Sequence, residues 1–427
     1  MPPNGGILNG ETTPLLSGGS SNTADEPKWK ALPKHILTTI WATLCSNYVN
    51  VLLVFVPIGI IAGALGWNPT AVFILNFIAI VPLAALLSFA TEEISAKLGQ
   101  TLGGLMNATF GNAVELIVSI VALREGKIRI VQSSMLGSIL SNILLVLGCC
   151  FLAGGIRERE SSFNATVAST MSSLMAVACS SLIIPATLYA ALRDSKTETE
   201  SNILLLSRGT SIILLILYLM YLYFQLFSHH SLFADVGEDE DDEAGSTLSP
   251  VAAGFALVIV TVMVAICAEY LVDSIDAIVQ TAHISETFVG LILLPIVGNA
   301  AEHVTAVIVA SKGKMDLAIN VAIGSSMQIA LFVTPFLVIL GWIIGKPMSL
   351  RFETFETVVF FLSVLVVNYL IQDGKSNYLE GAMCIGTYTI IALAFYVYPD
   401  DATGGNPNHG GTGGIPPDFF KSLLSSG

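Results

Sequence analysis

Charged side chains are scarce in this sequence, at 12% of 427 residues, whereas soluble domains carry about a quarter. Hydrophobic residues make up 53% of the chain, and the mean hydropathy is +0.75. This balance excludes a soluble globular fold. The apolar runs are continuous rather than alternating, which favours membrane-spanning helices over a β-barrel.

Basic residues are also few, with 18 Lys and Arg against 32 Asp and Glu, and no basic patch is present. A nucleic-acid partner is therefore not expected. Much of the net charge of −14 comes from one acidic run, Asp235 to Glu243. The first forty-odd residues are polar and lack an apolar segment of the signal-peptide type, so we interpret them as a disordered cytosolic tail.

Motifs for covalent or metal chemistry are missing as well. The six cysteines form no CxxC pair, and most lie in apolar runs, so we expect small core residues rather than a disulfide or metal framework. Neither HExxH nor GxSxG occurs, which argues against an intramembrane hydrolase. The sequence therefore predicts a protein that is not an enzyme and needs no cofactor.

Eleven apolar runs approach the length of about 20 residues that a spanning helix needs: 48–65, 70–90, 103–123, 130–153, 167–192, 203–227, 251–272, 287–311, 316–345, 355–372 and 378–398. They predict an all-α membrane protein with about 11 transmembrane helices in a lipid bilayer. The expected divisions are a cytosolic tail (1–44), an extra helix (45–68), a first five-helix repeat (69–230), an acidic cytosolic linker (231–249), a second five-helix repeat (250–400) and a flexible tail (401–427).

The two five-helix blocks carry the same motif. GNAVE (111–115) and GNAAE (298–302) place their glutamates 187 positions apart (302 − 115 = 187). The Gly-Ser pairs at 137–138 and 324–325 have the same separation. An odd number of spans in each block makes the second copy enter the membrane from the opposite side. The blocks are thus predicted to be inverted repeats, a common transporter architecture.

Each repeat contains a carboxylate within the membrane, and inserting one at the helix centre costs about 2.5–3.5 kcal/mol on insertion scales. Asn112 and Glu115 are three residues apart, as are Asn299 and Glu302, so each pair shares one helix face. The preceding glycines, Gly111 and Gly298, permit an unwound backbone whose carbonyls can point at a ligand. We therefore expect these six residues to form a midplane ion site: Asn112, Glu115, Asn299, Glu302, Gly111 and Gly298.

The chemistry of this set favours a hard cation. Carboxylate, amide, hydroxyl and backbone oxygens suit Ca²⁺, which takes 6–8 oxygen ligands. Burial disfavours an ionised carboxylate without a cation, so the same two glutamates are expected to take protons when the ion leaves. A shared pair of carboxylates that holds either Ca²⁺ or protons predicts antiport by competition.

The segments TLGGLMNATFGNAVELIVSI and ISETFVGLILLPIVGNAAEH resemble the two α-repeats of the calcium/cation antiporter superfamily. Within it the chain resembles the cation/proton exchanger branch, and fungal vacuolar Ca²⁺/H⁺ exchangers in particular, from about residue 30 to 400. The resemblance implies eleven spans and Ca²⁺ movement from the cytosol into an acidic vacuole. It also implies ion binding by Glu115 and Glu302, assisted by Asn112 and Asn299.

Further residues are candidates for the transport pathway or a proton relay, some of them because the family suggests it. Two acids lie in similar FATEE and ICAEY contexts, and two glutamines follow the repeat glutamates on the next span. Each of these residues also has an ordinary structural interpretation, as an interfacial group or an interhelical hydrogen bond. The candidates are Glu92, Glu269, Gln132, Gln328, Ser138, Ser325 and His303.

The acidic run is either a solvated linker or, as the resemblance implies, a cytosolic helix that attracts Ca²⁺ through Glu238, Asp239, Glu240, Asp241, Asp242 and Glu243. ETTPLL (11–16) resembles an acidic dileucine signal that a cytosolic sorting adaptor would bind. Lys and Arg counts on the two sides are equal, so the positive-inside rule does not decide the orientation. A vacuolar membrane location with a cytosolic N-terminus is expected from the resemblance.

Two other transport functions fit the same residues. A Na⁺/Ca²⁺ exchanger would need additional acidic or hydroxyl ligands beside the glutamates, and no clear set is visible. A broader divalent cation/H⁺ exchanger is also consistent, because similar oxygen sites accept Mn²⁺. A channel is less favoured, because inverted repeats with broken helices are typical of alternating access.

Overall fold

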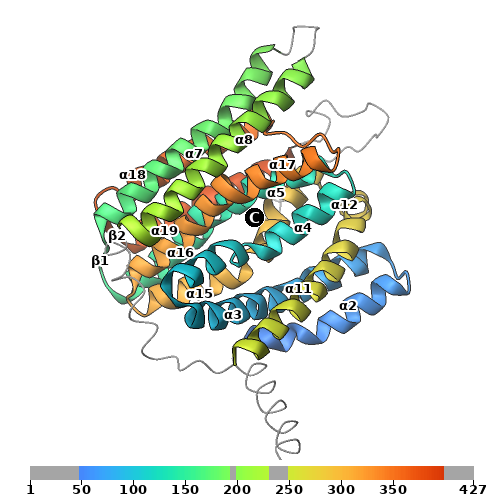
Figure 1. Cartoon of the computed structure of the whole chain (residues 1–427), viewed down its shortest axis with the longest axis horizontal. Helices are drawn as coiled ribbons and strands as arrows, with labels where there is room; N and C mark the ends of the chain where they lie inside the picture. Colours follow the sequence, from blue (N-terminus) through green and yellow to red (C-terminus); the bar gives the residue numbers. More distant parts are fainter. Residues whose placement is uncertain (1–47, 193–198, 230–248, 399–427) are drawn as a thin grey trace, which may run out of the picture. The chain divides into compact units, whose positions relative to one another are not determined.

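The protein is described here by a computed structural model of residues 48–192, 199–229 and 249–398 (Figure 1). Nearly all of this part is helical. Its two strands, β1 (Ser161–Ser162) and β2 (Lys375–Ser376), pair antiparallel and join a loop of the first repeat to a loop of the second. The predictions for the tails, the sorting signal and the acidic residues 238–243 lie outside the described residues.

The first repeat and the helix before it form one run of elements. They are η1 (Tyr48–Val54), α2 (Phe55–Ala64), α3 (Pro69–Phe110), α4 (Ala113–Arg124), α5 (Ile128–Leu140), η2 (Ser141–Val146), α6 (Leu147–Arg157), α7 (Ala165–Leu192), α8 (Thr199–Tyr223) and η3 (Phe224–Ser228). η1 is a 3₁₀ helix, while η2 and η3 are π-helical turns within longer helices.

The second repeat follows the same plan, but the stretch that corresponds to the single helix α3 is divided into several shorter elements. Its elements are α11 (Pro250–Asp273), α12 (Ile275–Ala282), α13 (Glu286–Phe288), η4 (Val289–Leu293), α14 (Leu294–Gly298), α15 (Ala300–Ser311), α16 (Met315–Gln328), η5 (Ile329–Val333), α17 (Thr334–Ile343), α18 (Thr354–Leu370) and α19 (Tyr378–Val397). η4 and η5 are π-helical turns.

Equivalent helices of the two repeats begin with the same kind of sequence signal. Asn68 caps α3 by accepting a hydrogen bond from the Thr70 backbone N–H at 2.9 Å, and Pro69 occupies the first helical position. Ser249 caps α11 in the same way, and Pro250 follows it. Proline fits this position because its missing N–H would have no partner inside the helix. The start of each repeat is thus encoded locally.

The predicted all-helical membrane fold with two repeats is confirmed, and the lengths of its spans vary. Within the described residues, seven helices are long and apolar enough to cross a membrane, or up to eight if the bent pair Ile275–Ala282 and Glu286–Gly298 counts as one span. Three shorter apolar helices accompany them, Val49–Ala64, Ala300–Ser311 and Thr354–Leu370. The runs expected at 103–123 and 287–311 are each divided in two.

Both divisions fall at the Gly-Asn pair. Asn112 (φ −101°, ψ 27°) separates α3 from α4, and Asn299 (φ −86°, ψ 5°) separates α14 from α15. Neither conformation continues an α-helix smoothly, so the backbone unwinds for about one residue. The interruption that the glycines suggested is therefore present in both repeats.

Each repeat also turns back on itself before this interruption. In the second repeat α12 ends at Ala282, the following His283 has a left-handed φ of 52°, and the segment Glu286–Gly298 is bent by 118° relative to α12. In the first repeat the turn lies inside α3, where Gly103 packs against the Ser95 backbone carbonyl eight residues earlier. A side chain at Gly103 would collide with that carbonyl, so this position requires a glycine.

The helices pack across the two repeats. α3 lies along its counterpart α11, with α2 beside them (Figure 1). In addition, α6 packs on α19, and α5 packs along η4. In this described part, four of the cysteines expected to be core residues are buried, Cys149 is half-buried, and all five are free thiols. Buried polar residues at the helix breaks include Asn112, Glu115 and Asn299.

Candidate ion-binding site

Two short helices each present a glutamate in their first turn. Glu115 is the third residue of α4, and Glu302 is the third residue of α15. A helix N-terminus carries a partial positive charge and unpaired N–H groups, which favour a nearby anion. Glu115 is only 5% exposed, and Glu302 is half-buried. Both carboxyls are thus held in the interior at equivalent helix starts.

The residue before the first of these helices is fully paired. Asn112 donates its Nδ2 to Gln328 Oε1 at 2.6 Å and accepts from Ser325 Oγ at 2.9 Å. Ser325 in turn accepts from Asn142 Nδ2 at 3.0 Å. One connected chain of amides and hydroxyls therefore joins α4, α16 and η2 across the two repeats.

Glu302 lies beside this chain. Ser325 and Asn142 are within hydrogen-bonding reach of its carboxyl, and Glu115 is near enough to interact with it electrostatically. Its Oε2 atom is buried without a hydrogen-bond partner among the described residues. The adjacent His303 places its Nε2 3.2 Å from Ser141 Oγ. The two glutamates therefore belong to one polar cluster.

The counterpart of Asn112 in the second repeat is unpaired. Asn299 is fully buried, and neither its Oδ1 nor its Nδ2 has a hydrogen-bond partner within the described ranges. Ser138 Oγ and Asn142 Oδ1 are also buried and have no hydrogen-bond partner among the described residues. Leaving such groups unpaired costs about 1–3 kcal/mol each, so their oxygens are candidate ligands for a bound cation.

Glu115 lies directly against the unwound segment of the other repeat. A Cβ atom at Gly298 would lie 2.8 Å from Glu115 Oε1, so a larger residue there would displace the carboxyl. A cavity of about 10 Å³ adjoins it, lined by α3, α4, α5, α11 and α14. That volume holds about one water molecule. Glu115 and Ser134 supply the polar side chains of its lining.

The outer candidates lie elsewhere. Glu92 is exposed and accepts a hydrogen bond from Ser88 at 3.0 Å. Glu269, near the end of α11, pairs with Arg124 at 2.7 Å on the surface. Gln132 donates to the Ser349 backbone carbonyl at 2.8 Å, in the segment before α18. Of the two predicted glutamines, the structure thus brings only Gln328 to Asn112.

Two members of the polar cluster could not be found by comparing the sequences of the two repeats. Asn142 corresponds to Ile329 and Ser141 corresponds to Gln328, so neither is repeated. Both follow the repeated Gly-Ser pair within five residues on the same helical run, and that spacing was the available clue. No group of three or more His, Cys, Asp or Glu side chains suited to a metal occurs in the described part. An ion would therefore need amide, hydroxyl or backbone oxygens besides the two carboxylates.

The fold and cluster define a polytopic helical protein with two broken-helix repeats that meet at buried carboxylates. A family model for the sodium/calcium exchanger protein matches residues 68–227 and 252–397, and the chain belongs to that family. The matched residues cover both repeats.

Curated relatives resemble the chain over most of their length. A vacuolar calcium ion transporter of Schizosaccharomyces pombe is 54% identical, over 84% of this chain and 87% of the relative. Vacuolar cation/proton exchanger 2 of Oryza sativa is 43% identical, over 92% and 90%. The native YfkE structure has a TM-score of 0.71 at 36% identity, covering 82% of this chain and 100% of YfkE.

A crystal structure of the H⁺/Ca²⁺ exchanger CAX has a TM-score of 0.63 at 13% identity, covering 86% of this chain and 89% of CAX. At this identity the likeness concerns the fold alone. It agrees with the arrangement of two inverted repeats.

Proposed function

We propose that the chain is a secondary Ca²⁺/H⁺ antiporter of a vacuolar membrane, which moves cytosolic Ca²⁺ into an acidic lumen. The relatives named as vacuolar calcium transporters and cation/proton exchangers support the ions and the membrane. The observation that carries the proposal is that Glu302 lies beside Glu115 and Asn142, and that buried oxygens of Glu302, Asn142 and the neighbouring Asn299 have no hydrogen-bond partner among the described residues.

Calcium fits this set of donors. Glu115 and Glu302 would supply two negative charges, enough to balance one divalent cation. Asn299, Ser138 and Asn142 would add neutral oxygens, and the unwound backbone at Gly111 and Gly298 would add carbonyls. Sites of this kind reach the 6–8 oxygen ligands that Ca²⁺ takes.

Protons would replace the ion on the same carboxyls. Two buried glutamates close to each other disfavour a double negative charge in a medium of low dielectric constant. Either Ca²⁺ or protons relieve that cost, so the two cargoes compete. Charge balance alone asks for at least two protons per Ca²⁺. An acidic lumen supplies those protons and releases the Ca²⁺ there.

Competition becomes transport only if the site opens to one side at a time. The two repeats pack differently on the two sides of the cluster. Gly137 of α5 lies against the Leu291 backbone carbonyl, whereas its counterpart Gly324 of α16 has the Met171 side chain as its nearest neighbour, at 3.7 Å. This difference supports alternating access. The proposed orientation, with the N-terminus and the acidic linker in the cytosol, comes from the family resemblance.

The proposal is tested by reconstituting the full chain in liposomes with an acidic lumen and following uptake of radioactive Ca²⁺. Glu115→Gln and Glu302→Gln should each lower uptake to the protein-free background. Glu160→Gln removes a surface carboxylate that is 61% exposed and should leave uptake unchanged. Uptake that follows a Na⁺ gradient, or that survives loss of both central glutamates, would overturn the proposal.

A further inference from the structure

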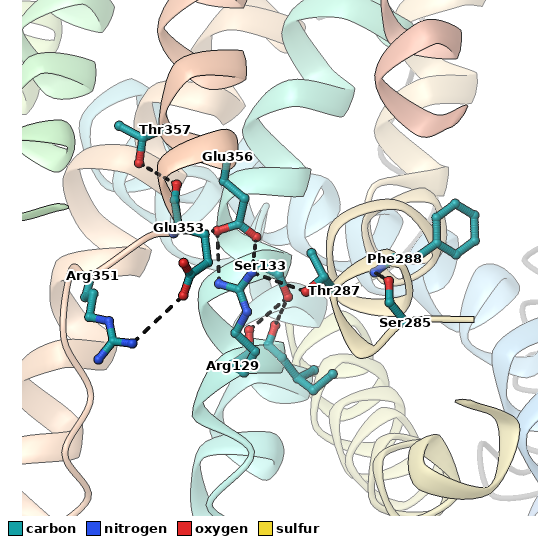
Figure 2. A network of polar contacts seen from close by, with 10 residues as sticks. Arg129, Ser133, Ser285, Thr287, Phe288, Arg351, Glu353, Glu356 and Thr357 are labelled. Atoms are coloured by element: carbon teal, nitrogen blue, oxygen red, sulfur yellow. Dashed lines mark hydrogen bonds and ion pairs between the residues drawn. The ribbon is translucent and has the colours of Figure 1, made fainter. Parts of the chain in front are cut away.

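A buried ion pair joins the two repeats at one end of the bundle. Arg129, in the first turn of α5, donates its Nη1 to Glu356 Oε2 at 2.9 Å and its Nη2 to Glu356 Oε1. Its Nη2 also donates to Thr287 Oγ1 at 3.2 Å (Figure 2). The Arg129 side chain is 22% exposed, and that of Glu356 is 1% exposed. Two parallel hydrogen bonds make this the most geometrically specific form of an ion pair.

The pair ties three separate elements together. Arg129 belongs to α5 of the first repeat. Glu356 belongs to the first turn of α18 in the second, where it also accepts from the Glu353 backbone N–H at 3.1 Å in a capping box. Thr287 lies in α13, the start of the segment that leads to Gly298 and Asn299. A movement of α5 away from the second repeat must therefore break this contact.

Behind the pair, α5 and η4 are in close contact. Gly290 packs against Ser133, and Gly137 packs against the Leu291 carbonyl one turn further along α5. Gln132 adds its hydrogen bond to Ser349 on the same stretch. No room is left between α5 and η4 at these positions, so this side of the cluster is shut.

The opposite end has a much weaker counterpart. Asp316 of α16 stands in the repeat position of Arg129, and its Oδ1 accepts one hydrogen bond, from the Asn164 backbone N–H at 2.6 Å, at the start of α7. The same pairs of elements thus meet at both ends, α5 with α18 and α16 with α7. The α5–α18 contact has a bidentate ion pair at this position, whereas the α16–α7 contact has a single hydrogen bond at the surface, beside the β1–β2 strand pair and the hydrogen bond from Arg157 to the Ser311 carbonyl.

Stability alone does not account for such a pair. Buried ion pairs often contribute no more to folding than apolar residues of similar size, because burying both charges is costly. A contact that exists in one arrangement and not in another does, however, shift the population of the two arrangements. The position of Arg129 across the seam between the repeats suits this second effect.

The geometry points to a latch: the Arg129–Glu356 pair holds the α5–η4 side of the site shut and must open once in each transport cycle. This inference rests on the proposed function, because a cytosolic N-terminus puts the α5–η4 side of the site toward the lumen. Arg129 is thereby a positioning residue, since it acts on the path and touches neither Glu115 nor Glu302 in the hydrogen bonds described. Weakening the pair favours the arrangement that opens toward the lumen.

Two cysteine reporters at equivalent repeat positions test the latch. Ser134→Cys lies on α5 in the lining of the cavity beside Glu115, and Val321→Cys is its counterpart on α16. Each is made in the full chain in lipid nanodiscs and labelled with a water-soluble maleimide. The chain without a reporter gives the background from its own cysteines, of which those described are buried or half-buried.

Glu356→Gln should raise the labelling rate at Ser134→Cys by at least about fivefold and lower it at Val321→Cys, within the usual range of coupling between states. Glutamine keeps an oxygen for the Glu353 N–H, so α18 retains its cap. Arg129→Lys keeps the charge but loses the planar fork and should shift both rates in the same directions by less. Arg124→Gln breaks an exposed ion pair at the same end and should shift neither rate.

A rise in labelling at both reporters would mean general loosening and would overturn the latch, as would unchanged rates. Labelling does not depend on which ion is carried. If Ca²⁺ uptake by the parent chain fails while the reporters respond reciprocally, the proposed function is wrong and the latch remains. If the parent exchanges Ca²⁺ for protons and the reporters do not respond, the latch alone is wrong.

Discussion

The two repeats place the same residues at the same spacing, yet their contacts differ on the two sides of the site. Asn112 has hydrogen bonds to Ser325 and Gln328, while its counterpart Asn299 has no partner in the described structure. On α5, Gly137 touches the backbone of the other repeat, while Gly324 on α16 does not. The two repeats are thus similar in sequence, but equivalent residues make different hydrogen bonds and packing contacts.

This difference is what an exchanger of the proposed kind requires. If both repeats made the same contacts at once, both sides of the site would be equally shut or equally open. Because only one set is formed, exchanging the two sets would give a second arrangement of similar energy, with the opposite side open. In that second arrangement Asn299 would contact Ser138 and Ser141, which stand in the repeat positions of the Asn112 partners Ser325 and Gln328.

The largest expected effect comes from adding one methyl group to each of two equivalent glycines. Gly137→Ala would place a Cβ against the Leu291 carbonyl, where backbone atoms must move, and should cost about 3 kcal/mol. Gly324→Ala meets only the flexible end of Met171 at 3.7 Å and should be neutral or slightly stabilising. Thermal unfolding in detergent measures both.

Equal losses of stability from the two alanines would show that Gly324 also enters a close contact, and the comparison of the repeats would fail. A loss of stability confined to Gly137→Ala would support the difference in packing between the two repeats. Uptake of Ca²⁺ measured on the same samples should fall for Gly137→Ala, because the shut side no longer closes.

The two asparagines should respond in different ways to removal. Asn112→Ala leaves Ser325 and Gln328 without their partner and should lower stability by about 1–2 kcal/mol. Asn299→Ala removes a buried amide that has no partner, so it should not lower stability in the absence of Ca²⁺. It should instead reduce the increase in melting temperature that Ca²⁺ produces. Melting curves with and without Ca²⁺ decide this.

If Asn299→Ala destabilises the Ca²⁺-free protein as much as Asn112→Ala does, then Asn299 has partners of its own and the two repeats are alike. If both variants keep the full response to Ca²⁺, neither amide binds the ion. The matched pair therefore separates a structural contribution from a binding one at the same motif position.

The smallest effect is expected at the rim. Lys127 and Asp276 form an ion pair of 2.6 Å, but the Asp276 side chain is 64% exposed. Asp276→Asn should change the free energy of unfolding by less than about 1 kcal/mol, and added salt should reduce that difference further. Melting temperatures at low and high salt measure it. A large loss would mean that the rim, rather than the buried pair of Arg129, holds this end together.

The sequence predicted the parts of the fold that are repeated. The common separation of 187 positions located Glu115 and Glu302, and the helices that carry them, α4 and α15, begin at Ala113 and Ala300 with the same separation. The Gly-Asn pairs correctly indicated where the helices break. These features are local, so the residues themselves encode them.

Features that depend on contacts distant in sequence were not predictable in this way. Gln132 was expected near the glutamates, but its partner Ser349 lies 217 positions away in a segment that no motif marks. Asn142 was missed because its counterpart is Ile329. Residues at the same repeat position do not always make the same contact. Which contact forms depends on how the helices pack on each side of the bundle, and the sequence of one repeat does not reveal this.

The short strand pair β1–β2 fixes the distance between one loop of the first repeat and one loop of the second. Ser161 pairs with Ser376, Phe163 donates to the Gly374 carbonyl at 2.9 Å, and α6 packs on α19 behind them. Two loops from different repeats cannot separate without breaking these bonds. The distance between labels placed on the two loops would therefore stay constant. A third label on α2 or α3 would report how far that part moves relative to this constant distance.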